Sequence, residues 1–172
     1  NDGSTDNTVK IANELGVDHI VGFQKNQGLA RGFMLGIHTA LDLGADIIVN
    51  TDADNQYDAN CIPKLIEPII NNRAEIVVGE RPILKHKEFS FIKKILQKLG
   101  SFVVRILSGT QVKDAPSGFR AFSKDAALQL NVYNNYTYTL ETLIQAGNKG
   151  LRVKSVPIKV NQFLRPSRLF GS

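Results

Sequence analysis

The sequence has little cysteine and no long apolar run, and both absences restrict what the protein can be. The single cysteine, Cys61, excludes a disulfide framework and a zinc site built from several cysteines. No window of about 18 residues is free of charge, so no segment is predicted to span a bilayer. The first residues have neither the basic nor the apolar region of a signal peptide. The 42% hydrophobic and 22% charged residues are typical of a single globular domain, which we assign to residues 1–172.

Charge is divided unevenly along the chain. Residues 1–80 hold 5 basic and 12 acidic residues, whereas residues 81–172 hold 16 basic and 4 acidic ones, which gives net charges of −7 and +12. An acidic half suits a metal cation, and a basic half suits phosphates, an anionic membrane surface or nucleic acid. The alternative is that these charges are merely solvated and bind no partner. The sequence motifs have to distinguish the two interpretations.

Helical and strand patterns alternate, which predicts one α/β domain without repeats or linkers. Pro157 favours an edge position or a bulge for the last strand. A buried strand at 47–49 runs directly into polar residues, and α/β folds place ligands at such strand ends. Helices are predicted over 5–15, 29–43, 60–72, 89–107, 124–130 and 138–147, and strands over 17–23, 47–49, 75–79 and 152–160, with a further element beginning at Phe122.

The sharpest motif is Asp52-Ala53-Asp54, directly after that buried strand. Two carboxylates two residues apart can turn toward one divalent cation, and hard oxygen ligands favour Mg²⁺ or Mn²⁺. Acidic pairs at strand ends also form turns or caps, so the motif alone decides little. A calcium loop of the EF-hand type is the rival, but its sixth position is Tyr57 instead of glycine and its twelfth is Pro63 instead of glutamate.

Four further polar segments occur in a fixed order around this motif. Residues 1–6 read Asn-Asp-Gly-Ser-Thr-Asp, a turn that would also serve as a plain helix cap. Residues 26–32 read Asn-Gln-Gly-Leu-Ala-Arg-Gly, residues 79–81 Gly-Glu-Arg, and residues 117–120 Ser-Gly-Phe-Arg. Together the five motifs resemble the family-2 inverting glycosyltransferases, which have the GT-A fold. The D-A-D-x-Q form resembles that of polyprenyl-phosphate sugar transferases such as the dolichol-phosphate mannose synthases.

The resemblance implies a GT-A (Rossmann-like) α/β fold with a mixed, mostly parallel sheet flanked by helices. It implies a UDP- or GDP-linked sugar as donor, Mg²⁺ or Mn²⁺ as cofactor, and no nucleic-acid partner. The residues it implies for donor binding are Asp2, Ser4, Asn26, Gly28, Arg31, Asp52, Ala53 and Asp54; those for the metal are Asp52, Asp54 and Gln56; and those for catalysis are Asp52, Asp54, Asp114 and Arg120.

The resemblance also implies segments that this chain lacks. Family members have a strand, a helix and a second strand before the Asp-Gly-Ser turn, and residues 165–172 resemble the stretch before membrane helices. We therefore expect a catalytic domain truncated at both ends, acting on the cytoplasmic face of a membrane. An inactive nucleotide-binding fragment is the non-enzymatic alternative.

A lipid phosphate is the favoured acceptor on chemical grounds. A sugar hydroxyl needs a general base near neutral pH, whereas a phosphate monoester is already anionic. Such an acceptor needs cations, which we expect from Arg81 and Lys93, with Ser117 beside them. The alternative is a carbohydrate hydroxyl acceptor, for which Asp114 or Glu141 would be the base. If the acceptor is a phosphate, these carboxylates would orient Arg120 or the donor sugar.

The helix at 89–107 bears on the same choice. Its apolar residues form one stripe and its lysines another face, so it can lie in a membrane interface or pack its stripe on the sheet. The stripe consists of Phe91, Ile92, Ile95, Leu96, Leu99, Phe102, Val103, Ile106 and Leu107.

Overall fold

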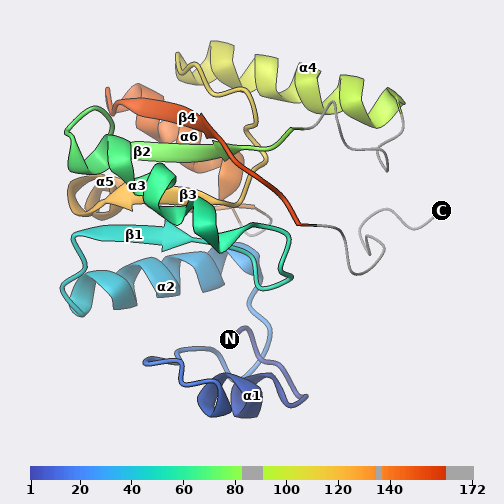
Figure 1. Ribbon diagram of the computed structural model, residues 1–172, viewed down its shortest axis with the longest axis vertical. Helices are drawn as coiled ribbons and strands as arrows, with labels where there is room; N and C mark the ends of the chain where they lie inside the picture. The colour runs from blue at the N-terminus through green and yellow to red at the C-terminus, as the bar shows by residue number, and fades with distance from the viewer. Residues whose placement is uncertain (83–90, 135–136, 162–172) are drawn as a thin grey trace.

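The computed structural model describes residues 1–82, 91–134 and 137–161, with the side chains of residues 91–98 excluded. Helices and strands alternate along the chain as predicted, except that α1 is followed directly by α2 and α5 by α6 (Figure 1). The elements are α1 (Thr8–Glu14), α2 (Leu29–Asp42), β1 (Ile47–Asn50), the 3₁₀ turn η1 (Ala59–Cys61), α3 (Ile62–Ile70), β2 (Ile76–Glu80), α4 (Phe91–Ser108), β3 (Arg120–Ser123), α5 (Lys124–Gln129), α6 (Thr139–Asn148) and β4 (Val153–Pro157).

The four strands form one mixed sheet in the order β1-β3-β2-β4. Strands β1, β2 and β4 run in the same direction and β3 runs against them, so only the β2–β4 pair is parallel among the described strands. Among the described strands β4 lies at the edge of the sheet, which is one of the two alternatives that Pro157 indicated. Arg120, the first residue of β3, pairs with Asn50 on one side and Val78 on the other. The ends of β1 and β2 and the loop that enters β3 therefore meet at one edge of the sheet.

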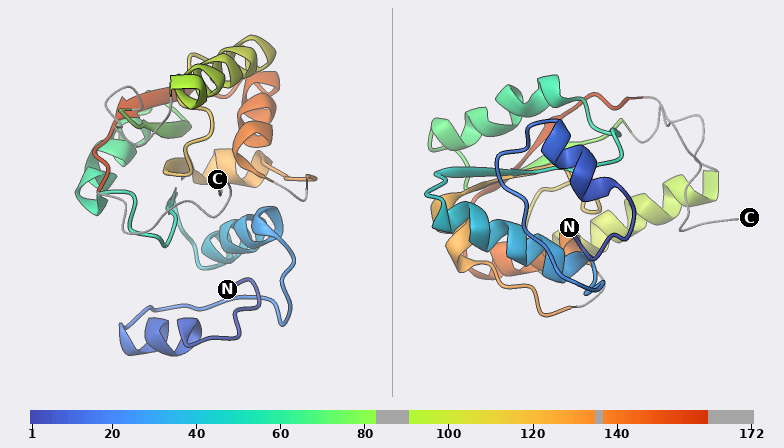
Figure 2. Two further views of the ribbon diagram at one scale, coloured as in Figure 1. Left: turned by 90° about the vertical axis from the view of Figure 1, so that its right-hand side faces the viewer. Right: turned by 90° about the horizontal axis from the view of Figure 1, so that it is seen from below.

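Helices cover both faces of the sheet because residues along each strand alternate between two apolar clusters. Ile76 and Phe122 face one cluster, which α2, α5 and α6 complete. Val77 and Ala121 face the other, which α3 completes. Val78 contacts α4 and α6 in a third cluster with Val104 and Leu143. The expectation of a mixed sheet flanked by helices is confirmed (Figure 2).

The first 28 residues pack differently from the prediction. The strand expected at 17–23 does not form, and the segment makes one isolated bridge, between Asp2 and Phe23. Helix α1 has no buried residue and lies apart from the sheet, beyond α2 (Figures 1 and 2). Val21 and Phe23 lie two positions apart, as in a strand, but no neighbouring strand among the described residues supplies the ladder that would extend the bridge.

Helix α4 turns its apolar stripe outward over the part whose side chains are described. Ser101, Val104 and Ser108 form its buried face, at most 5% exposed. It approaches α6 so closely that a Cβ on Gly147 would lie 1.6 Å from the Ser108 carbonyl oxygen. The outward residues, 46% to 66% exposed, are Leu99, Phe102, Val103, Ile106 and Leu107. The alternative in which this stripe packs on the sheet is therefore not realised over residues 99–108.

Candidate active site

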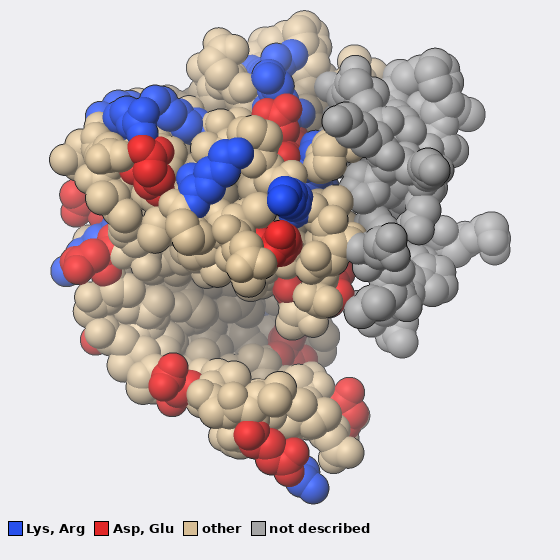
Figure 3. All heavy atoms as spheres, in the orientation of Figure 1, with Lys and Arg blue, Asp and Glu red and all other residues tan. Residues whose placement is uncertain are grey.

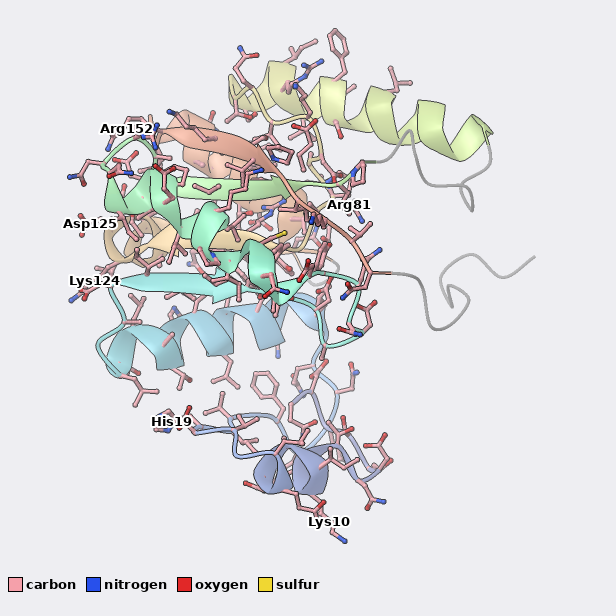
Figure 4. The ribbon with its side chains drawn as sticks, in the orientation of Figure 1. Lys10, His19, Arg81, Lys124, Asp125 and Arg152 are labelled. Atoms are coloured by element: carbon pink, nitrogen blue, oxygen red, sulfur yellow. The ribbon has the colours of Figure 1, made fainter. Side chains whose placement is uncertain are left out.

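The predicted motifs gather at the edge of the sheet where β1 and β2 end. Asp52 follows β1 by two residues, Arg81 follows β2 directly, and residues 114–120 form a loop that ends in the first residue of β3. Figure 4 shows Arg81 at this edge, with Lys124, Asp125 and Arg152 at the opposite end of the sheet. Helix α2 begins at the same edge, so residues 26–28 approach it as well (Figure 1). A shared strand end thus brings four of the five motifs together.

Asp52 is a desolvated carboxylate in a cationic surrounding. Burial raises its pKa above the ordinary 3.8, and the negative charge of Asp54 raises it further. The charges of Arg81 and Arg120 act in the opposite sense. Asp54 is exposed, and its Oδ1 accepts a hydrogen bond from the Gln56 backbone N–H at 3.1 Å. The motif therefore presents one partly buried and one solvent-facing carboxylate.

This donor set fits a divalent cation that is shared with a phosphate ligand. Within the described ranges, no group of three or more His, Cys, Asp and Glu side chains could enclose a metal. Mg²⁺ in proteins is typically held by one or two carboxylates together with substrate phosphates, and Asp52 with Asp54 would meet that requirement. Gln56 is half-buried beside them, and its place as a third ligand stays a prediction.

Arg81 and Asp114 form a buried two-pronged ion pair. Arg81 donates from Nε to Oδ2 at 2.7 Å and from Nη2 to Oδ1 at 2.9 Å. The Asp114 side chain is 0% exposed and that of Arg81 11%. Burial alone would lower the pKa of Arg81, but the hydrogen bonds and charge of Asp114 raise it above its ordinary value. Asp114 therefore orients Arg81. Its charge also opposes the lowering of the Arg120 pKa by burial, and the orientation of Arg120 or of the donor sugar by Asp114 stays a prediction.

Arg120 lies wholly inside the protein, where no direct contact with a bound donor is possible without rearrangement. Its guanidinium donates to the Ser117 carbonyl at 2.8 Å, the Ala115 carbonyl at 2.6 Å and Thr142 Oγ1 at 2.8 Å. Burial lowers its pKa to about 10, which still leaves it charged at neutral pH. Its observed place is thus that of an internal support for the 114–120 loop.

Three polar residues that the sequence analysis did not select complete this centre. Asn50 Nδ2 donates to the Gly118 carbonyl and to the Tyr138 hydroxyl, both at 2.7 Å. The Gly118 N–H donates to the Tyr57 hydroxyl at 3.1 Å. Burial raises the pKa of Tyr57, and burial with the charge of Asp52 raises that of Tyr138 to about 12. The proximity of Asn50 and Tyr57 to the D-A-D motif was the available signal, but Tyr138 had none.

The two N-terminal motifs bind each other through Asp2. Its carboxylate accepts the Gln27 N–H at 2.6 Å and the Gly28 N–H at 3.0 Å. Gly3 has φ +74°, and a Cβ on it would lie 2.6 Å from the Asn26 nitrogen, so the two segments touch through a glycine. Ser4, Asn26 and Arg31 are exposed. Their binding of a nucleotide stays a prediction.

The residues expected at the acceptor lie only partly among the described side chains. The Lys93 side chain falls outside them, and Ser117 is 0% exposed. Glu141 accepts the backbone N–H groups of Tyr133 and Asn134, each at 3.0 Å, so it fixes a turn. Of the expected acceptor groups whose side chains are described, Arg81 is the cation close to Asp52.

Comparison with known proteins places these motifs in a family. The sequence model of Glycosyl transferase family 2 matches residues 1–130. The UDP-N-acetylglucosamine–dolichyl-phosphate N-acetylglucosaminyltransferase of Methanococcus voltae is 38% identical, with 92% of this chain and 71% of that protein covered. The undecaprenyl-phosphate mannosyltransferase of Micrococcus luteus is 26% identical, with 89% of this chain and 65% of that protein covered.

Solved structures agree on the fold. Glucosyl-3-phosphoglycerate synthase from Mycobacterium tuberculosis, crystallised with Mn²⁺, UDP and phosphoglyceric acid, superposes with a TM-score of 0.74 at 18% identity, covering 95% of this chain and 58% of that one. The chain thus spans about two thirds of the length of these relatives and less than two thirds of that structure. The GT-A expectation for the fold is confirmed.

Proposed function

Because the chain belongs to glycosyl transferase family 2, we propose that it transfers a sugar from a nucleotide-linked donor to a polyprenyl phosphate. Two relatives named for dolichyl- or undecaprenyl-phosphate acceptors support the choice of acceptor. The observation that carries the proposal is the juxtaposition of a desolvated Asp52 with the Arg81–Asp114 pair at one sheet edge. At this edge, the carboxylates can hold a divalent cation together with the donor diphosphate, and the Arg81 guanidinium can bind the acceptor phosphate.

In the proposed reaction, an oxygen of the acceptor phosphate attacks the anomeric carbon of the sugar. The bond from that carbon to the diphosphate breaks, the nucleotide diphosphate departs, and the configuration inverts. A divalent cation on Asp52 and Asp54 would neutralise charge on the departing diphosphate. Asp2 and residues 26–28 would receive the nucleoside. Arg81 donates from Nε and Nη2 to Asp114, and in this proposal its Nη1 would donate to the acceptor phosphate.

The state of the two candidate bases supports a phosphate acceptor over a hydroxyl. Asp114 is fully buried and both of its oxygens accept from Arg81. The Glu141 carboxylate accepts hydrogen bonds from two backbone N–H groups and from Gln145 Nε2. Neither carboxylate is placed to take a proton from a hydroxyl, whereas a phosphate monoester brings its own negative charge.

A transfer assay separates the two acceptors. The protein would be incubated with Mn²⁺ and a radiolabelled UDP- or GDP-sugar, with either undecaprenyl phosphate or an oligosaccharide mixture as acceptor. We expect label in the lipid fraction only, and we expect Glu141→Gln to retain transfer. Label confined to the oligosaccharides, and lost in Glu141→Gln, would favour the hydroxyl acceptor instead.

Helix α4 supports a location at an anionic membrane surface. The described residues contain no helix with the length and hydropathy of a membrane span. The exposed stripe of α4 is instead flanked by Arg105, whose guanidinium carbon lies 5.5 Å from the Phe102 ring centroid. On the face shown in Figure 3, Lys and Arg lie over the upper part of the molecule, with the largest group at the upper left and a smaller one near α4, while the N-terminal segment shows mainly Asp and Glu. We assign the cytoplasmic leaflet, which is anionic, to this basic side.

Vesicle sedimentation tests this surface. The double variant Phe102→Ser, Ile106→Ser should bind anionic vesicles more weakly by about tenfold per residue, because each loses apolar burial of about 1.4 kcal/mol. The control is Leu128→Ser on α5, which is 63% exposed and should bind as the parent does. Rising salt should weaken all variants but leave part of the parent's binding, because burial is not screened. Equal binding by the double variant and the control would remove α4 from the membrane contact.

A further inference from the structure

Gly118 lies in direct contact with the carboxylate of Asp52. A Cβ built on Gly118 would be 2.8 Å from Asp52 Oδ2, 3.2 Å from Oδ1 and 3.2 Å from the Tyr138 hydroxyl. Real Cβ atoms essentially never show the first of these distances. Gly118 is not among the residues with positive φ, so alanine could adopt its backbone conformation. An alanine at position 118 would therefore displace the Asp52 carboxylate through its methyl group, without straining the backbone.

The Gly118 peptide is held on both sides, so it cannot move away from Asp52 without losing bonds. Its N–H donates to Tyr57 at 3.1 Å, and its carbonyl accepts from Asn50 at 2.7 Å. Asn50 is the last residue of β1 and stands two positions before Asp52. The same strand end that carries the carboxylate thus also fixes the loop that bounds it.

Aromatic stacking fixes the two hydroxyl groups of this arrangement. Tyr57 stacks on Phe119 with ring centroids 5.0 Å apart, and Tyr138 stacks on Phe33 at 3.9 Å with an interplanar angle of 3°. Both tyrosines are at most 5% exposed. The loop around Gly118 is therefore bounded by two buried, stacked tyrosine rings. Gly118 has no side chain that would separate this loop from the Asp52 carboxylate.

We propose that Gly118 is a positioning residue: it sets the place of the Asp52 carboxylate by direct contact, and through it the binding of the donor diphosphate. This inference rests on the proposed function, in which Asp52 serves the diphosphate. A methyl group at position 118 would push the carboxylate away from the loop while leaving the loop's two hydrogen bonds formally available. Donor binding should suffer more than the fold does.

Gly118→Ala tests the proposal, with Gly36→Ala as matched control. Gly36 lies on α2 with ordinary φ, and no atom lies within 4 Å of the place that an alanine methyl group would take, so its alanine variant should match the parent. In calorimetric titrations with UDP and GDP in the presence of Mn²⁺, Gly118→Ala should bind the nucleotide about 10 to 100 times more weakly, as is usual when the support of a ligating residue is altered. Parent-like affinity in a folded Gly118→Ala protein would overturn the proposal.

A thermal-unfolding cycle with Asp52→Ala tests the contact without any ligand. Gly118→Ala should lower Tm in the parent, and should lower it less in the Asp52→Ala background, because the carboxylate that the methyl group meets is gone. The same Tm loss in both backgrounds would overturn the proposal, since the cost would then arise elsewhere. If the parent binds no nucleotide with Mn²⁺ but the cycle shows coupling, the proposed function fails while the contact between Gly118 and Asp52 stands.

Discussion

Replacing Arg120 by methionine is expected to lower the free energy of unfolding by about 3–5 kcal/mol. The guanidinium is 0% exposed and donates to two loop carbonyls and one threonine hydroxyl. Methionine fills similar space but donates nothing, so the Ala115 and Ser117 carbonyls would stay buried without their partner. Urea unfolding followed by circular dichroism gives the free energy directly.

Arg152→Met is the control for this experiment. Arg152 pairs with Glu75 at 3.4 Å, but the arginine side chain is 54% exposed, and such pairs contribute about 0–1 kcal/mol. Arg120→Lys should resemble Arg120→Met, because one ammonium cannot reach three acceptors that lie around a planar guanidinium. A loss below about 1 kcal/mol in both Arg120 variants would contradict the supporting role of this side chain.

The second large effect is expected at Asp114. Asp114→Asn removes the negative charge that Arg81 contacts at two points, and it leaves two buried guanidinium groups, Arg81 and Arg120, that disfavour each other. The free energy of unfolding should fall by about 3–5 kcal/mol, as expected when one partner of a buried pair is lost. Denaturant unfolding of the single variants and of Arg81→Met, Asp114→Asn together measures the coupling between them.

Glu80→Gln serves as control, because its pair with Lys113 is 3.9 Å long and the lysine side chain is 68% exposed. It should change stability by no more than about 1 kcal/mol. The double variant at 81 and 114 should be more stable than the sum of the two single losses predicts, because neither member of the ion pair is then left without its partner. Strict additivity would mean that the two side chains do not stabilise each other.

The sequence predicted the elements and the place of the motifs because both depend on local patterning. Ile47 to Val49 are apolar and directly precede Asp52, so a strand end that presents carboxylates was predictable. The periodicity of residues 29–43 likewise predicted α2 to within one residue. Pro157 indicated an edge position or a bulge because proline lacks the N–H of a central ladder position, and the edge position is the one observed.

Contacts between distant residues could not be predicted in this way. Tyr138 meets Asn50 across 88 positions, and Gly118 meets Tyr57 across 61. Ser-Gly-Phe-Arg suggests a site motif, but nothing local shows that Arg120 points inward while Gly118 touches Asp52. The strand expected at 17–23 also failed for a non-local reason, since a strand needs a neighbour and local alternation does not supply one.

The buried face of helix α4 is likewise set by a contact between residues that are distant in the sequence. Its sequence predicted an amphipathic helix but left open which face is buried. In the structure the face of α4 with the small residues Ser101 and Ser108 is buried, because Gly147 on α6 allows the backbones of α4 and α6 to approach closely. Gly147 lies about 40 residues after α4 in the sequence, so the helical periodicity of α4 alone does not show which face is buried.

Metal-dependent nucleotide binding tests the proposed site most directly. UDP and GDP would be titrated into the parent, Asp52→Asn and Asp58→Asn, each with Mn²⁺ and with EDTA. Asp58 lies nearby in the sequence, and its carboxylate caps η1 by accepting the Asn60 N–H at 2.9 Å. Asp58→Asn therefore controls for the loss of one negative charge near the site. We expect Mn²⁺-dependent binding by the parent and by Asp58→Asn, and a loss of about 100-fold, or about 3 kcal/mol, in Asp52→Asn. Equal binding by Asp52→Asn and the parent, or equal binding in EDTA, would contradict a donor diphosphate held at Asp52 and Asp54.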